Sequence, residues 1–194
     1  MTRLLKSKIL YAIVLAGLFG IAFFTARQFN FQPNALVIVA LCFLLPARIT
    51  SYCWREFYAG QRLMQQENFG KANGKYETFL SQIRSRPWMK NLIIFKWGFF
   101  TWNIEAMTLN NLGLSYLEMN DLESARRYFD RAVALDPLYS VPYSNLAILS
   151  YVKGDDAQGR QLLSQSRSLG YSQFDEARAK KEAISTRSRL DSIV

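Results

Sequence analysis

The C-terminal half of the chain contains an internal repeat with a period of 34 residues. Residues 106–139 align with residues 140–173 without a gap, and Gly113 of the first copy lies over Ala147 of the second. Periods of this length are typical of proteins in which each copy contributes one helix pair and buries its apolar face against the next copy. The repeat therefore predicts an all-α fold for this half of the chain.

Certain residues of the first copy have the spacing of a known helical repeat. They are Leu112, Gly113, Tyr116, Ala125, Phe129, Ala132 and Pro137. The small residues let two helices approach closely, and the Leu and the two rings fill the space between them. On these residues the segment resembles the tetratricopeptide repeat (TPR) family. The resemblance implies a short solenoid of antiparallel helical hairpins, although the second copy departs from the motif at Ser150, Ser166 and Tyr171.

The resemblance also implies a protein-binding groove, lined by the first helix of each repeat. The groove positions in this sequence are Met107, Asn110, Leu114, Leu117, Val141, Ser144, Ile148 and Tyr151. Leu114 and Ile148 stand where a clamp for a C-terminal carboxylate needs polar groups, so we expect the ligand to be a helical or apolar segment of a protein partner. The alternative is that the insertion or the terminal helix of this chain fills the groove.

A degenerate third copy is predicted upstream of these two repeats. Within residues 52–86, Gly60 and Tyr76 have the same separation as Gly113 and Phe129. A third copy would help the fold, because repeats bury their apolar faces only against neighbouring copies.

Downstream, residues 174–194 are predicted to form a capping helix and tail. The segment from Ser172 to Asp175 resembles a capping box, which marks the start of a helix. We expect Phe174, Ala177 and Ile184 on the inner side of this helix, covering the last repeat.

Residues 87–105 form an aromatic insertion or linker between the upstream copy and the first repeat. Its tryptophans are Trp88, Trp97 and Trp102, and Lys90 and Lys96 lie among them. Aromatic residues with lysines favour the headgroup level of a membrane, so one interpretation is an interfacial segment. The other is a long helix leading into the repeat, with its aromatic side chains packed on neighbouring helices.

Residues 1–51 are predicted to form a membrane hairpin. Between Lys8 and Arg27 lie 18 uncharged residues, and between Arg27 and Arg48 lie 20 more. A helix of the first length is about 27 Å long, close to the ~30 Å thickness of a hydrocarbon core. We therefore expect spans at about 9–26 and 33–51. A cleavable signal peptide, a buried core hairpin and a shallow hairpin that enters one leaflet are the alternatives.

The charge distribution favours a membrane surface over nucleic acid as the partner of the basic half. The formal net charge is +9; residues 1–104 have 13 basic against 3 acidic residues, whereas residues 105–194 have 11 against 12. The excess thus flanks the apolar segments and does not form a basic face on the repeats. Because Lys and Arg are enriched at both ends of the hairpin, we expect both termini in the cytoplasm. Because the repeats have no basic face, we expect no nucleic-acid ligand.

The residue inventory argues against an enzyme. There are 0 histidines and 2 cysteines, Cys42 and Cys53, so histidine-based catalytic sites and multi-cysteine metal sites are excluded. We expect no cofactor, no metal site and no catalytic activity. The expected function is a membrane-anchored cytoplasmic TPR scaffold that binds protein partners. The alternatives are a structural subunit of a larger membrane complex and a TPR protein that faces the outside of the inner membrane.

Overall fold

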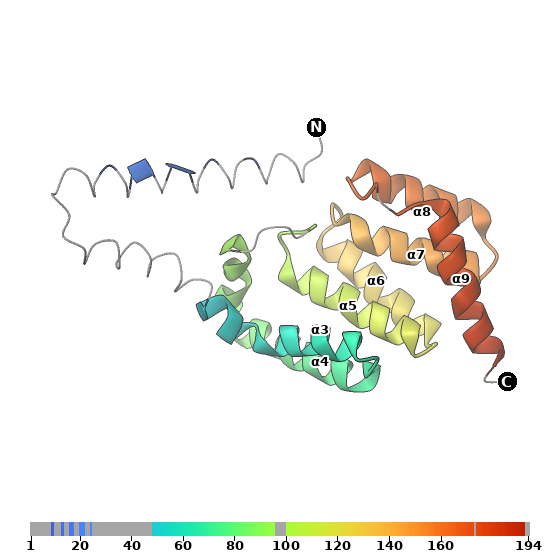
Figure 1. Cartoon of the computed structure of the whole chain (residues 1–194), viewed down its shortest axis with the longest axis horizontal. Coiled ribbons are helices and arrows are strands. Elements are labelled where there is room, and N and C mark those ends of the chain that lie inside the picture. The colour runs from blue at the N-terminus through green and yellow to red at the C-terminus, as the bar shows by residue number, and fades with distance from the viewer. Residues whose placement is uncertain are drawn as a thin grey trace.

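The computed structural model describes residues 48–95, 100–172 and 174–192, together with single positions between 9 and 24. Its elements are α3 (Arg55–Gln65), α4 (Phe69–Ser85), the 3-10 helix η1 (Pro87–Phe95), α5 (Ile104–Glu118), α6 (Leu122–Leu135), α7 (Ser140–Val152), α8 (Asp156–Ser168) and α9 (Glu176–Asp191) (Figure 1). Within the described residues there is no strand, so the all-α prediction is confirmed for them.

The helices pack as successive antiparallel hairpins. The pairs are α3 with α4, α5 with α6, and α7 with α8; α4 then packs on α5, and α6 on α7 (Figure 1). Helix α9 packs on α7 at the far end of the stack. The described part of the chain is thus a stack of helical hairpins, as expected for a TPR-type solenoid.

Each hairpin turns through one residue in the left-handed region. These residues are Glu67 (φ 57°), Asn120 (φ 61°) and Gly154 (φ 82°), and each lies seven positions after Gly60, Gly113 or Ala147. In all three turns the following N–H donates to the carbonyl five residues back, at 2.9 Å. This bond satisfies a carbonyl at the end of the first helix, so the three hairpins share one termination geometry.

In two hairpins an aromatic ring of the second helix fills the space left by a glycine of the first helix. A methyl group at Gly60 would lie 2.6 Å from a ring carbon of Tyr76, and one at Gly113 would lie 2.5 Å from a ring carbon of Phe129. In both hairpins the glycine is on the first helix and the ring comes from the second. Both rings are buried, because the absent Cβ leaves the space that they fill.

Two apolar cores lie along the stack. One joins α3, α4, η1 and α5 and includes the fully buried rings of Trp54, Phe57 and Phe79. The other joins α5 to α9 and is centred on Phe129 and Leu149. Successive hairpins therefore share side chains with their neighbours, which is how repeat stacks gain stability.

The insertion does not form the long helix that was one of its two interpretations. Helix η1 ends at Phe95, and α5 begins at Ile104 after residues 100–103, which are not helical. Asn103 is the N-cap of α5: its backbone is extended, and its side chain accepts hydrogen bonds from the first N–H groups of the helix. Helix α5 therefore starts here and does not continue from a helix upstream. Trp97 lies outside the described residues.

Helix α9 begins later than predicted and packs through a different face. Its N-cap is Asp175, whose carboxylate accepts from the N–H of Arg178 at 2.8 Å, so the predicted capping box at Ser172 was wrong. Phe174, just before the helix, is buried as predicted; Ala177 and Ile184 are exposed, whereas Ala179 and Ala183 are buried. Ala179 and Ala183 form the buried face because they lie one turn apart on the same side of α9, and their small side chains allow α9 to lie close to α7.

The predicted spans at 9–26 and 33–51 lie largely outside the described residues. Among the positions that the structure describes, no helix is both long and apolar enough to cross a membrane.

Candidate protein-binding face

The eight predicted groove positions form one face of α5 and α7, called here the groove face. Six of them are buried and have exposed fractions of at most 7 %: Met107, Asn110, Leu117, Ser144, Ile148 and Tyr151. Only Leu114 and Val141 are partly exposed. The structure therefore brings the predicted residues together on one face, of which Leu114 and Val141 are the accessible members.

Helix α9 covers one end of the groove face. Ala179 and Ala183 of α9 belong to the same apolar cluster as Leu117, Ile148 and Tyr151. Figure 1 shows α9 crossing α7 at the end of the stack. The terminal helix thus covers this end of the groove face, as the alternative interpretation of the sequence expected.

Charged groups of α9 hold it in this position. The Arg187 guanidinium donates to the carbonyls of Tyr151 and Val152, which lie at the C-terminal end of α7. Cations are favoured at helix C-termini, where carbonyls lack partners. Arg189 pairs with Glu118, the last residue of α5, at 3.1 Å. These two arginines connect α9 to the ends of both helices of the groove face.

A further ion pair fixes the start of α9. Lys180 lies 2.9 Å from the Asp156 carboxylate of α8, and its ammonium also lies over the Tyr151 ring. The hydrogen bond from Lys180 lowers the pKa of Asp156. Both side chains are partly exposed, so this pair orients α9 more than it stabilises the fold.

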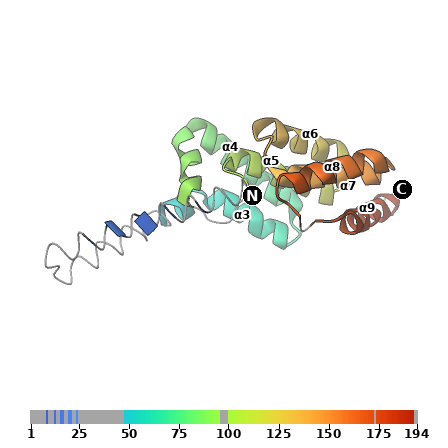
Figure 2. The same ribbon diagram turned by 90° about the horizontal axis from the view of Figure 1, so that it is seen from above.

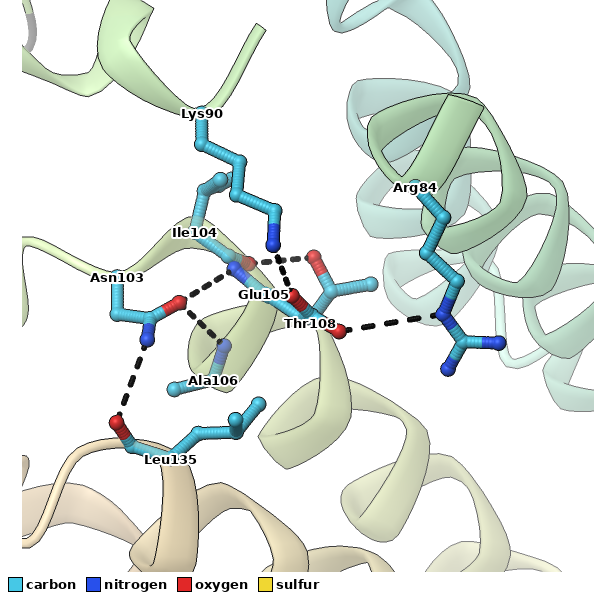
Figure 3. Close-up of polar contacts among 8 residues, drawn as sticks. All are labelled: Arg84, Lys90, Asn103, Ile104, Glu105, Ala106, Thr108 and Leu135. Atoms are coloured by element: carbon cyan, nitrogen blue, oxygen red, sulfur yellow. Dashed lines mark hydrogen bonds and ion pairs between the residues drawn. The ribbon is translucent and has the colours of Figure 1, made fainter. Parts of the chain in front are cut away.

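Helix η1 covers the other end of the groove face. Met107 lies in one apolar cluster with Met89 and Ile93 of η1. Figure 3 shows how this contact is fixed: Lys90 of η1 and Arg84 of α4 converge on the Glu105 carboxylate, at 2.5 and 4.0 Å. The insertion therefore packs back on the first repeat.

Asn103 ties the start of α5 to the end of α6. Its side chain accepts from the N–H groups of Glu105 and Ala106 and donates to the Leu135 carbonyl at 3.4 Å (Figure 3). The cap thus also fixes the two helices of this hairpin relative to each other.

The one amide of the groove face, Asn110, binds a neighbouring amide of α7. Nδ2 of Asn145 donates to Oδ1 of Asn110 at 2.8 Å, and Asn110 is 2 % exposed. Paired and buried amides are not available to a ligand carboxylate, because breaking the pair would leave polar groups unsatisfied.

Tyr151 is placed differently from the sequence expectation. Its ring packs against Gly159 of α8, where a methyl group would lie 2.6 Å from a ring carbon. Its hydroxyl is buried and has no hydrogen-bond partner among the described residues. The signal was present in the sequence, because Gly159 stands where the first repeat has Ala125 and leaves room for a ring from α7.

The motif residues of the first repeat lie in the interface between α5 and α6. Leu112, Gly113, Ala125, Phe129 and Ala132 are buried, and Tyr116 is half-buried and stacks on Tyr128. The exposed motif residue, Pro137, follows the end of α6. Sequence reasoning identified these positions but not Arg187 and Arg189 of α9, which no repeat motif marks.

Stacked antiparallel helix pairs with this packing define a helical-repeat protein. The family model of the tetratricopeptide repeat matches residues 106–139. The chain therefore contains a TPR repeat, and its boundaries there are those of the first predicted copy. A comparison with curated proteins finds no match.

Proposed function

We propose that this protein is a membrane-anchored, non-catalytic TPR scaffold that binds a protein partner. The TPR repeat at 106–139 carries the proposal, because such repeats generally bind proteins. The shared turn of the hairpins and the packing of Gly60 on Tyr76 support a third repeat at 52–86. The two uncharged runs before Arg48 support an anchor with spans at 9–26 and 33–51 and cytoplasmic termini.

The partner is proposed to enter the groove face between η1 and α9. Leu114 and Val141 are its partly exposed members, and both are apolar. An apolar or helical segment of the partner fits this chemistry better than a carboxylate, since Asn110 and Asn145 are already paired.

Site-specific photocrosslinking tests where the partner binds. A photoreactive phenylalanine replaces Leu114 in the full chain in native membranes, and the matched control carries it at Leu138, which is 47 % exposed and outside the groove face. We expect a discrete crosslinked protein from position 114 and none from 138. Equal crosslinking at both positions, or none at 114, would contradict binding at the groove face.

The burial of six groove positions favours a second candidate function, a structural subunit of a membrane complex. In that case the repeats mainly support the assembly. Affinity purification in mild detergent separates the candidates: stoichiometric co-purification without a Leu114 crosslink supports the subunit, and a substoichiometric partner crosslinked at Leu114 supports the scaffold.

The side of the membrane is tested separately. Digestion of the repeats only in opened cells supports the cytoplasmic orientation. Digestion in intact cells supports the alternative in which the repeats face the outside of the inner membrane.

A further inference from the structure

The aromatic insertion and the segment that leads into α3 meet at one end of the folded domain. The indole Nε1 of Trp54 donates to the Met89 carbonyl of η1 at 3.1 Å, and both residues are buried. Figures 1 and 2 show η1, in green, beside the start of α3 at the end opposite α9. Residues that are 35 positions apart in the sequence therefore share one surface.

This surface exposes large apolar side chains. Tyr52 is 73 % exposed, Trp88 52 % and Ile49 48 %. Tyr52 and Trp88 have an apolar ring with a polar group, the combination that favours the level of lipid headgroups. Three large apolar side chains are thus exposed to solvent at one end of the described domain.

The same end has an excess of positive charge. Arg48, Arg55 and Arg86 are exposed there, and Arg55 lies over the Tyr52 ring at 5.8 Å. Residues 48–95 have 8 basic against 3 acidic residues, whereas residues 100–192 have 11 against 12. The positive charge of the described protein is therefore concentrated in the part that contains η1 and the start of α3.

The nearby carboxylates do not offset this charge at the surface. Glu56 pairs with Lys75 at 2.9 Å and with Arg55, and its pKa is lowered mainly by the hydrogen bond from Lys75. Glu105 is bound in the same way by Lys90 and Arg84. Both side chains are at most 15 % exposed, so the surface presents mainly arginines and rings.

We propose that this basic aromatic end, formed by Arg48, Ile49, Tyr52, Arg55, Arg86 and Trp88, binds the surface of an anionic lipid bilayer. It extends the proposed function, because the uncharged run at 28–47 ends directly before Arg48. Rings at the headgroup level and arginines near anionic lipids both stabilise the contact. The contact holds the domain with η1 toward the bilayer and α9 away from it, so the groove face has a fixed height above the membrane.

Tryptophan quenching in vesicles tests this contact. The full chain is reconstituted into phosphatidylcholine vesicles with bromines near the headgroups, with or without phosphatidylglycerol, and vesicle flotation is measured in parallel. We expect phosphatidylglycerol to increase the quenching of tryptophan fluorescence. This increase is expected to disappear at high salt and in the variant Trp88→Phe. The control Trp102→Phe removes a tryptophan that is 44 % exposed but is not one of the residues of this surface, and it retains the gain.

The charge contribution is tested with matched triple variants. Arg48→Gln with Arg55→Gln and Arg86→Gln lowers the ratio of docked to undocked domain by about fivefold per arginine. The control triple, Arg126→Gln with Arg127→Gln and Arg131→Gln on α6, leaves the ratio unchanged. An equal decrease of this ratio in both triple variants would overturn the proposal, because it would show that the bilayer attracts the positive charge of the protein wherever that charge lies.

Flotation separates failure of the anchor from failure of this contact. A chain that floats with neutral vesicles but shows no quenching of Trp88 keeps its anchor and overturns the contact. A chain that floats only with anionic vesicles at low salt, with Trp88 quenched, lacks the anchor and supports the contact. Shielding of Trp88 from iodide in native membranes but not in vesicles would overturn the proposal and assign this end to a protein partner.

Discussion

The two hairpins that align at an offset of 34 residues place the glycine and the aromatic ring of their helix contact on opposite helices. In α5–α6 the glycine is Gly113 on the first helix, and the ring is Phe129 on the second. In α7–α8 the glycine is Gly159 on the second helix, and the ring is Tyr151 on the first. A small and a large side chain have exchanged helices, so the interface stays filled in both hairpins while the Tyr151 ring packs against Gly159. Two copies of one repeat can therefore keep their packing and still present different surfaces.

The α3–α4 hairpin follows the first arrangement. Its glycine, Gly60, is on the first helix, and Tyr76 supplies the ring, 16 positions later, as Phe129 does after Gly113. Two hairpins of different sequence thus place the ring on the second helix, and only α7–α8 among the three places it on the first. The difference predicts that the two closures respond differently to the same substitutions.

Removing the ring tests the difference most strongly. Phe129→Ala is expected to lower the free energy of unfolding by about 3–5 kcal/mol, because Phe129 is fully buried between two hairpins. Tyr151→Ala is expected to cost about 2 kcal/mol, because removing its unpartnered hydroxyl offsets part of the loss. Urea unfolding of the full chain in detergent measures both. Equal costs would contradict the asymmetry.

Most of the hairpin structure followed from the sequence. The first-copy motif predicted the close contact of two helices at Gly113 and the ring of Phe129 between them, because both depend on residues close in sequence. The inverted closure was not predicted, because the repeat motif marks a small residue at position 125 but does not show which ring fills the space at the aligned Gly159. The cover over the groove face was expected only as the alternative in which the insertion or the terminal helix fills the groove. Its position could not be derived, because it depends on where two separate segments, η1 and α9, fold back.

Adding a methyl group gives a second test of the same interface. Gly113→Ala is expected to lower the free energy of unfolding by about 1–2 kcal/mol, since the methyl group forces the Phe129 ring to move and the better helix propensity of Ala offsets only part of this. The control is Gly74→Ala on α4, where a methyl group meets nothing within 4 Å. It is expected to stabilise the protein by about 0.5–1 kcal/mol. Stabilisation by both would show that the ring moves without cost.

Removing one hydroxyl is the finest test. Tyr151→Phe is expected to raise the free energy of unfolding by up to about 1 kcal/mol, because its hydroxyl is buried without a partner. Tyr143→Phe is the matched control: this hydroxyl donates to the Pro137 carbonyl at 3.0 Å, and its loss is expected to cost about 1 kcal/mol. Urea midpoints at an unchanged slope measure both changes.

The alkaline limit of stability gives a further check on Tyr151→Phe. Burial raises the pKa of Tyr151 above its usual 10.0, so its contribution is complete below pH 10 and is lost as the pH rises through the folded-state value. Tyr151→Phe removes this loss, so the variant is expected to gain stability relative to the unsubstituted protein as the pH rises above 10. A gain that is the same at neutral and alkaline pH would place the Tyr151 hydroxyl in contact with water and contradict the inverted closure.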